Sequence, residues 1–143
     1  MLSNSSKYAL KAVLYLAVHT SEEHKLMVKE IYAPINVPKA YLSKLFQELA
    51  RHGIISSTRG PKGGFYLTEE NRQQPLIRII EVIEGPVRLT SCMLSLEGCN
   101  EQKPCPLHAI MQPSRTKMTR MLEQLSVNDL AKDLHDERSF LPL

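Results

Sequence analysis

Long apolar segments are missing from this sequence of 143 residues. Its longest uninterrupted apolar run, Ala12 to Val18, is far shorter than the roughly 20 residues that a membrane-spanning helix requires. A polar Ser-Asn-Ser-Ser stretch stands before it, where a signal peptide would carry basic residues. We therefore expect a cytoplasmic protein with no membrane partner.

Cysteine is also scarce, and all of it lies in one short segment. The three cysteines are Cys92, Cys99 and Cys105, and no other occurs. An odd number of thiols in a cytoplasmic chain argues against a disulfide framework. Their clustering argues against three unrelated core residues, so this segment is expected to bind or to sense something.

Motifs for catalytic turnover are missing as well. The sequence contains no nucleotide-binding loop and no nucleophile paired with an activating base, so we do not expect an enzyme.

The charge of the chain differs between its two halves: residues 1–72 hold ten Lys/Arg and six Asp/Glu, whereas residues 73–143 hold eight Lys/Arg and nine Asp/Glu. The basic front half favours an anionic partner, although a net charge of this size needs a motif beside it.

Helical and strand periodicities place a helix-turn-helix and a hairpin in the front half. The expected elements are a helix capped by Ser5 or Ser6 that ends near His19, helices over 27–33 and 38–51, a left-handed cap at Gly53, strands over 54–58 and 65–68 around a turn at 59–64, a loop over 69–74, and a helix over 75–84. A helix-turn-helix followed by a hairpin is a winged helix. We expect Pro38 at the first helical position of its helix.

The rear half is expected to hold the cysteine loop over 87–106 and a long helix over 106–125 that Pro113 kinks. Ser126 can cap a last helix over 127–134, and the tail 136–143 is expected to be loose. Apolar spacing along the long helix is typical of a coiled-coil seam between two chains: Leu107, Met111, Ser114, Met118, Met121 and Leu125. The predicted fold is therefore mainly α with a small β-hairpin wing, divided into a DNA-binding region, 1–74, and a cysteine and dimerisation region, 75–143.

The polar face of the helix over 38–51 and the basic turn after it form a candidate surface for DNA. Such a face alone is most often only solvated, but a glycine-containing basic hairpin directly after it favours DNA binding. The candidate DNA-binding residues are Lys39, Ala40, Tyr41, Ser43, Lys44, Gln47, Arg59, Gly60 and Lys62.

The cysteine spacing differs from that of structural zinc sites, where ligand pairs stand two to four residues apart. Three thiolates on a wide loop suit a larger object such as an iron–sulfur cluster. His108, three residues after Cys105, is either a fourth ligand with its ring toward that sulfur or an ordinary histidine near a helix start. A redox-active thiol set without metal is the other interpretation of the cysteines.

The sequence resembles the IscR/NsrR/CymR family of bacterial winged-helix regulators over nearly its whole length. The residues that carry the resemblance are Lys7-Tyr8-Ala9-Leu10, Tyr41-Leu42-Ser43-Lys44-Leu45-Phe46, Arg59-Gly60-Pro61-Lys62-Gly63-Gly64-Phe65, the three cysteines and the helix after them. The resemblance implies a homodimeric transcription regulator that binds double-stranded, pseudo-palindromic DNA. It also implies a 2Fe–2S or 4Fe–4S cluster held by Cys92, Cys99 and Cys105.

The fourth ligand separates branches of this family. In IscR-like members it is a histidine three residues after the last cysteine, which matches His108, whereas in some NsrR-like members it is an acidic residue of the partner's first helix. Lys7 or Lys11 stands at the matching position here, and an ammonium group cannot bind iron. The resemblance therefore favours a 2Fe–2S cluster over a 4Fe–4S cluster. Two alternatives stay open: a metal-free, thiol- or ligand-responsive DNA-binding regulator, and an iron–sulfur electron carrier, which would leave the wing unexplained.

Overall fold

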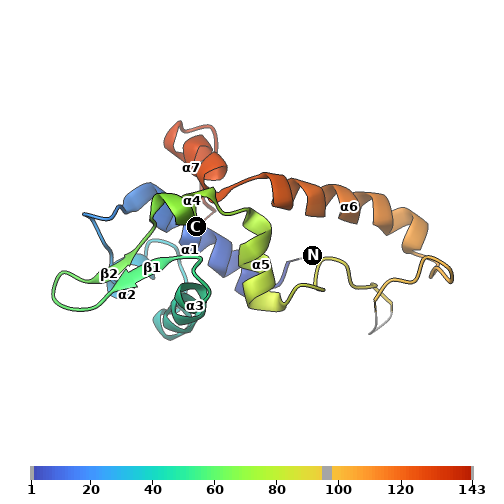
Figure 1. Ribbon diagram of the computed structural model, residues 1–143, viewed down its shortest axis with the longest axis horizontal. Helices are drawn as coiled ribbons and strands as arrows, with labels where there is room; N and C mark the ends of the chain where they lie inside the picture. The colour runs from blue at the N-terminus through green and yellow to red at the C-terminus, as the bar shows by residue number, and fades with distance from the viewer. Residues whose placement is uncertain (1, 95–97, 143) are drawn as a thin grey trace.

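The computed structural model describes residues 2–94 and 98–142, so Ser95 to Glu97 of the expected cysteine loop and Leu143 of the tail lie outside the described residues. The described part is mainly helical with a two-stranded antiparallel hairpin (Figure 1), which confirms the predicted fold class. In chain order the elements are α1 Asn4–His19, α2 Val28–Ile31, α3 Lys39–Arg51, β1 Ser56–Thr58, β2 Gly64–Tyr66, α4 Glu69–Gln73, α5 Leu76–Glu84, α6 His108–Gln124 and α7 Val127–His135.

Helix α1 is the central helix of the core. Its side chains are buried on more than one side, as its all-round apolar sequence predicts, and it packs against α5, α7 and α3. Ser3 caps it by accepting a hydrogen bond from the Ser6 N–H at 3.2 Å, so the prediction of a cap at Ser5 or Ser6 is wrong. The Ser6 side chain is instead fully buried.

Helices α2 and α3 form the predicted helix-turn-helix. Helix α2 is shorter than the range 27–33, and the turn that follows it ends near Asn36, whose φ of 54° lies in the left-handed region. Pro38 is the residue before the first turn of α3 and not its first helical residue. Gly53 has a φ of 71° and ends α3 as predicted.

The hairpin pairs Ser57 with Phe65 at its centre, and both strands are shorter than predicted. Ile54 and Ile55, which were expected to begin the first strand, are buried in the core instead. Leu26, from the segment before α2, pairs with Phe65 on the outer side of β2. This pairing ties the wing to the helix-turn-helix.

Helix α4 occupies most of the segment 69–74 that was predicted as a loop, and that prediction is wrong. Thr68 caps this helix by accepting from the Asn71 N–H at 3.2 Å. The buried Asn71 amide accepts from Ser56 Oγ at 2.7 Å and donates to the Gly53 carbonyl at 2.9 Å. A single polar side chain thus joins the end of α3 to the first strand of the wing.

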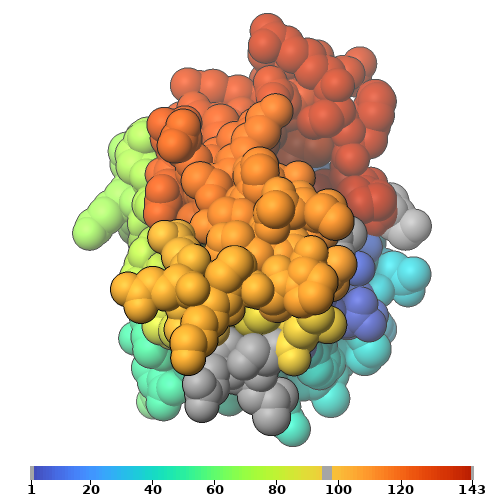
Figure 2. Space-filling view, turned by 90° about the vertical axis from the view of Figure 1, so that its right-hand side faces the viewer, coloured from blue at the N-terminus to red at the C-terminus, as the bar shows by residue number. Residues whose placement is uncertain are grey.

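Helix α6 extends away from the core, and none of its residues is buried. It continues as one helix through Pro113. Figure 1 shows the wing and the cysteine segment at opposite ends of the molecule, and Figure 2 shows α6 and the segment before it covering the second of these ends. No helix in the described part of the chain is long and apolar enough to span a membrane.

Helix α7 returns to the core, where Val127 and Ala131 are buried. Ser126 caps it as predicted and shares hydrogen bonds with Asp129. The tail is less loose than expected, since Leu141 packs against the core although Phe140 is 79% exposed.

Candidate functional site

The outer face of α3 is available to a ligand at four of the six predicted positions. Lys39, Ala40, Lys44 and Gln47 are exposed, whereas Tyr41 and Ser43 are half-buried. Ser43 Oγ donates to the Lys39 carbonyl at 2.9 Å, within the helix.

Tyr41 is held by the first helix. Its ring lies edge-on to the ring of Tyr8, with the centroids 5.7 Å apart, and its hydroxyl contacts Ser5 Oγ. These contacts fix the position of the N-terminal turn of α3 relative to α1. Tyr41 therefore contributes more to positioning the helix than to its free surface.

The wing turn presents Arg59, Gly60 and Lys62 to solvent, as predicted. Gly60 has a φ of 101°, and its carbonyl accepts from the Gly63 N–H at 2.9 Å. A side chain at Gly63 would place its Cβ 2.3 Å from the Thr58 carbonyl oxygen, so this position requires glycine. The glycines thus give the turn the shape that carries its two cations outward.

The cations of this surface are free of carboxylate partners within residues 2–94 and 98–142: Lys39, Lys44, Arg59 and Lys62. The nearby carboxylate of Glu48 is engaged by Arg51 and His52, and the Arg51 hydrogen bond is the main reason that its pKa is lowered. The unpaired cations are suited to phosphate oxygens.

The three cysteines and His108 line one small pocket at the far end of the molecule. Cys92 and Cys105 are in contact, with their sulfurs 3.8 Å apart, and Cys99 Sγ lies 3.1 Å from His108 Nδ1. The predicted approach of the His108 ring to the sulfur of Cys105 is not what the structure shows. The ring contacts Cys99, whereas the His108 backbone N–H donates to the Cys105 carbonyl at 2.9 Å.

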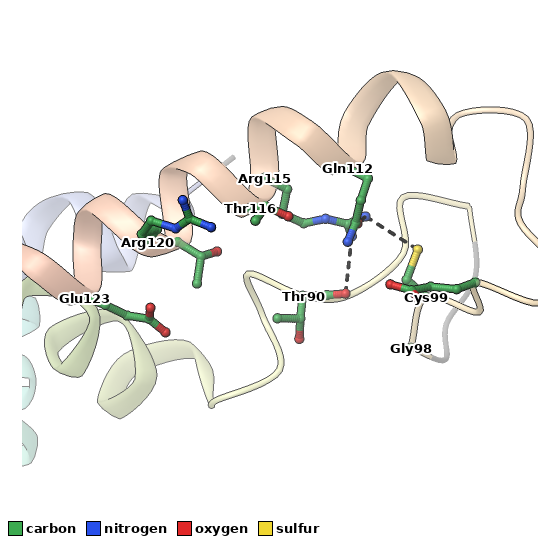
Figure 3. A pocket seen from close by; sticks show the side chains of 10 residues that line it. Thr90, Gly98, Cys99, Gln112, Arg115, Thr116, Arg120 and Glu123 are labelled. Carbon is green, nitrogen blue, oxygen red and sulfur yellow. Dashed lines mark hydrogen bonds between the residues drawn. The ribbon is translucent and has the colours of Figure 1, made fainter.

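Arg115, which the sequence interpretation missed, reaches from α6 to the cysteine segment (Figure 3). Its guanidinium donates to the Ser91 carbonyl at 2.5 Å, the Thr90 carbonyl at 3.2 Å and Cys99 Sγ at 3.5 Å. Gln112 Oε1 accepts a further bond at 2.7 Å. Arg115 stands seven residues after His108, which is about two helical turns. Helical spacing therefore places both side chains on one face of the helix, and this is the sequence signal that could have identified Arg115.

An open pocket of about 540 Å³ lies beside Cys99, between α6 and the segment before it. Arg115, Arg120 and Glu123 contribute polar side chains to its wall (Figure 3). The cysteine pocket is therefore bordered by a polar cavity on one side of α6.

Glu84, at the end of α5, anchors the start of the cysteine segment to the beginning of α1. Its carboxylate accepts from the Ser3 N–H at 3.0 Å and from Ser3 Oγ at 2.7 Å, and it pairs with Arg88 at 2.5 Å. Burial opposes ionisation of this carboxyl, but the nearby Ser6 hydroxyl, the hydrogen bonds from Ser3 and the charge of Arg88 outweigh it, so the pKa of Glu84 is lowered.

The donor set in the cysteine pocket fits an iron–sulfur cluster in its chemistry, since thiolates and imidazole are the protein ligands of such clusters. Two thiolates bound to one tetrahedral metal at about 2.3 Å lie about 3.8 Å apart. The sulfurs of Cys92 and Cys105 have this separation. In the described part of the chain, no group of three or more His, Cys, Asp or Glu side chains is arranged around a single point where one metal ion could be held.

Comparisons with known proteins agree with this architecture. Residues 2–133 match the Rrf2 family, described as an iron-dependent transcriptional regulator. The HTH-type transcriptional regulator IscR of Xenorhabdus nematophila is 30% identical over 132 residues, which are 92% of this chain and 79% of the relative. A putative HTH-type transcriptional regulator of Aquifex aeolicus is 28% identical, with 91% and 90% covered.

Solved structures show the same fold. CymR, the global cysteine regulator of B. subtilis, superposes with a TM-score of 0.75 at 25% identity, covering 92% of this chain and 96% of that one. IscR of T. potens gives a TM-score of 0.72 at 23% identity, with 97% and 91% covered. These relatives are transcription regulators and not enzymes, and the chain belongs to the Rrf2 family of winged-helix transcription regulators.

Proposed function

We propose that this protein is a homodimeric regulator whose binding to a pseudo-palindromic DNA site is set by an iron–sulfur cluster. The observation that carries the proposal is the convergence of Cys92, Cys99, Cys105 and His108 on one pocket. Residues 1–74 would bind DNA, and residues 75–143 would hold the cluster and the dimer contacts.

The arrangement of the four donors in two contacting pairs supports a 2Fe–2S cluster over a 4Fe–4S cluster. In a two-iron cluster each iron takes two protein ligands, and imidazole can replace thiolate. Cys92 and Cys105 would hold one iron, and Cys99 and His108 the other. When bound, the cluster would supply one-electron redox chemistry and sensitivity to oxidants.

For DNA, we assign the exposed face of α3 to base and phosphate contacts in the major groove. The wing would contact the adjacent backbone or minor groove. Support comes from the exposed cations of these two elements, Lys39, Lys44, Arg59 and Lys62, which have no carboxylate partner within residues 2–94 and 98–142. The proposed contacts are Lys39, Ala40, Lys44 and Gln47 together with the half-buried Tyr41 and Ser43 on α3, and Arg59, Gly60 and Lys62 on the wing.

Visible absorbance of the anaerobically purified protein tests the cluster. We expect a brown protein, and we expect that Cys→Ala at any one of the three positions abolishes the chromophore. His108→Ala is expected to keep a labile or spectrally altered cluster. Ser114→Ala, an exposed position of α6, is the control and should leave the spectrum unchanged.

A metal-free thiol- or ligand-responsive regulator is the second candidate. The similarity to a solved structure described as a global cysteine regulator favours it. A colourless protein with three titratable thiols, whose DNA binding responds to thiol oxidation or to a small molecule, would replace the cluster proposal with this one.

A further inference from the structure

The three cysteine sulfurs make different contacts in the chain without a cluster. Cys92 and Cys105 form one contact, with Cys92 Sγ donating to Cys105 Sγ at 3.8 Å. Cys99 belongs to a different contact group, since its sulfur is hydrogen-bonded to His108 Nδ1 and receives a bond from the Arg115 guanidinium. The three thiols are therefore not equivalent in the folded chain.

We propose that Cys92 and Cys105 are a disulfide-forming site of the cluster-free protein, and that Cys99 keeps its thiol. The two sulfurs lie 3.8 Å apart, and a disulfide bond is about 2.05 Å long, so they must approach each other by about 1.8 Å to form the bond. Both cysteines lie outside helices and strands. The segments that carry them can make this movement without breaking a regular element.

Arg115 binds the sulfur of Cys99. Its guanidinium is fixed by the carbonyls of Thr90 and Ser91 as well as by the sulfur. Because Arg115 belongs to α6, it links Cys99 to this helix, and His108 of the same helix contacts the Cys99 sulfur through Nδ1. Pairing Cys99 with another cysteine would break these contacts, whereas joining Cys92 to Cys105 leaves them in place.

The proposed oxidant is a low-molecular-weight disulfide. One protein thiolate attacks it, forms a mixed disulfide and releases one small thiol. The second protein thiolate then attacks the protein sulfur of that mixed disulfide, which forms the Cys92–Cys105 bond and releases the second small thiol. Both electrons pass from the two cysteines to the small disulfide, and each step is reversible. The product is therefore set by which protein pair closes with least distortion, not by which thiol reacts first.

The cross-link would remove two of the four donors from the pocket, so the oxidised chain could not hold the cluster proposed above. The cross-link itself does not depend on that proposal, because it concerns the thiols of the cluster-free chain. Reduction of the disulfide by a small thiol restores the free thiols of Cys92 and Cys105, so that all three cysteines are thiols again.

Peptide mapping tests this inference. The full chain is freed of metal with a chelator, equilibrated anaerobically with oxidised glutathione, quenched with acid and alkylated under denaturing conditions. Trypsin does not separate the cysteines, because cleavage after Lys103 is blocked by Pro104. Cleavage after glutamate does, since it yields peptides 85–97, 98–101 and 102–123, each with one cysteine.

We expect peptide 85–97 joined to 102–123 in clear excess over the other two pairings, with Cys99 alkylated. The Cys99→Ser variant should form this cross-link to the same extent, and Cys92→Ser should lose it. A predominant pairing through Cys99, a stable mixed disulfide with glutathione, a cross-link between chains, or three thiols that stay reduced would each overturn the inference.

Discussion

At the scale of single residues, Arg115 connects two parts of the molecule that the sequence keeps 16 positions apart, α6 and Cys99. Its hydrogen bonds to the carbonyls of Thr90 and Ser91 also satisfy backbone groups of a segment that lacks a helix or strand of its own. Arg115 is therefore a positioning residue for the cysteine pocket.

Replacing Arg115 with alanine is expected to loosen this segment. Hydrogen bonds from a charged group contribute about 1.5–3 kcal/mol, so amide hydrogen exchange around Thr90 to Cys92 should become about tenfold faster or more. Arg115→Lys should restore part of the protection, because an ammonium group can reach only some of the acceptors. Arg120→Ala is the control on the same helix, and an equal effect from both alanine variants would show that Arg115 has no special role.

At the same scale, the carboxyl of Glu84 makes the stability of the folded chain depend on pH. Its pKa is lowered in the folded chain, in spite of burial, by Ser6, Ser3 and Arg88. A carboxyl with a folded pKa below its unfolded value, about 4.3, contributes stability that is present above that pH and is lost as the pH falls through the folded pKa.

We therefore expect Glu84→Gln to lower the melting temperature at neutral pH and to lose this difference from the wild type in acid. Thermal melts between neutral pH and pH ~3 check it. Glu81→Gln, three residues earlier on α5, with a half-buried side chain that pairs with Arg78, is the control. If the difference between wild type and Glu84→Gln stays constant down to acid pH, the carboxylate is not the stabilising group.

At the scale of elements, sequence patterns predicted the parts of the fold that local chemistry determines. Helix α3, the left-handed Gly53 and the Ser126 cap follow from short-range signals and are present. Helix α4 was missed because it is only a few residues long, and its stability depends on Asn71 bonding to Ser56 and Gly53 from other elements. The cap at Ser3 was likewise hidden by three neighbouring serine and asparagine residues with equal propensity.

The candidate site was predictable in composition but not in arrangement. Clustering identified the three cysteines and helix spacing identified His108. The pairing of Cys99 with His108 depends on how a wide loop folds back on α6. Such contacts arise from tertiary structure, and no short-range pattern encodes them. Helical spacing could have placed Arg115 on the face of His108, but it could not have identified its acceptors, which are mainly backbone carbonyls of a distant segment.

The wing gives the prediction at this scale. We expect Arg59→Ala to weaken DNA binding by about 1–3 kcal/mol, because it removes one of the exposed cations that the glycine-rich turn carries outward. Adding Lys62→Ala should also reduce the salt dependence of binding. Binding is measured by titrating a fragment selected from random DNA, with Arg138→Ala in the tail as the control. Unchanged affinity and salt slope in the double variant would contradict the assignment.

At the scale of the whole molecule, α6 is a long helix that contacts α5 and the cysteine segment but has no buried residue. The residues of its predicted seam lie in different surroundings. Leu107 and Met111 line the cysteine pocket, and Leu125 packs against the core of its own chain. Ser114, Met118 and Met121 remain, and Met121 is 49% exposed. A helix that projects from a small core gains little stability alone, so a second copy of the chain is the partner that we propose for this stretch.

We expect Met118→Glu plus Met121→Glu to convert the proposed dimer to a monomer, because each copy would then place two carboxylates in the proposed apolar contact. Sedimentation equilibrium measures the change directly. Asn100→Glu plus Gln124→Glu adds the same charge at exposed polar positions and should leave the dimer intact. The monomer should also lose tight binding to DNA with two half-sites, since two recognition helices must reach major grooves one helical turn, about 34–36 Å, apart. If the methionine variant stays dimeric with its circular dichroism unchanged, the two chains meet through another surface, and Met118 and Met121 make no contact with a second chain.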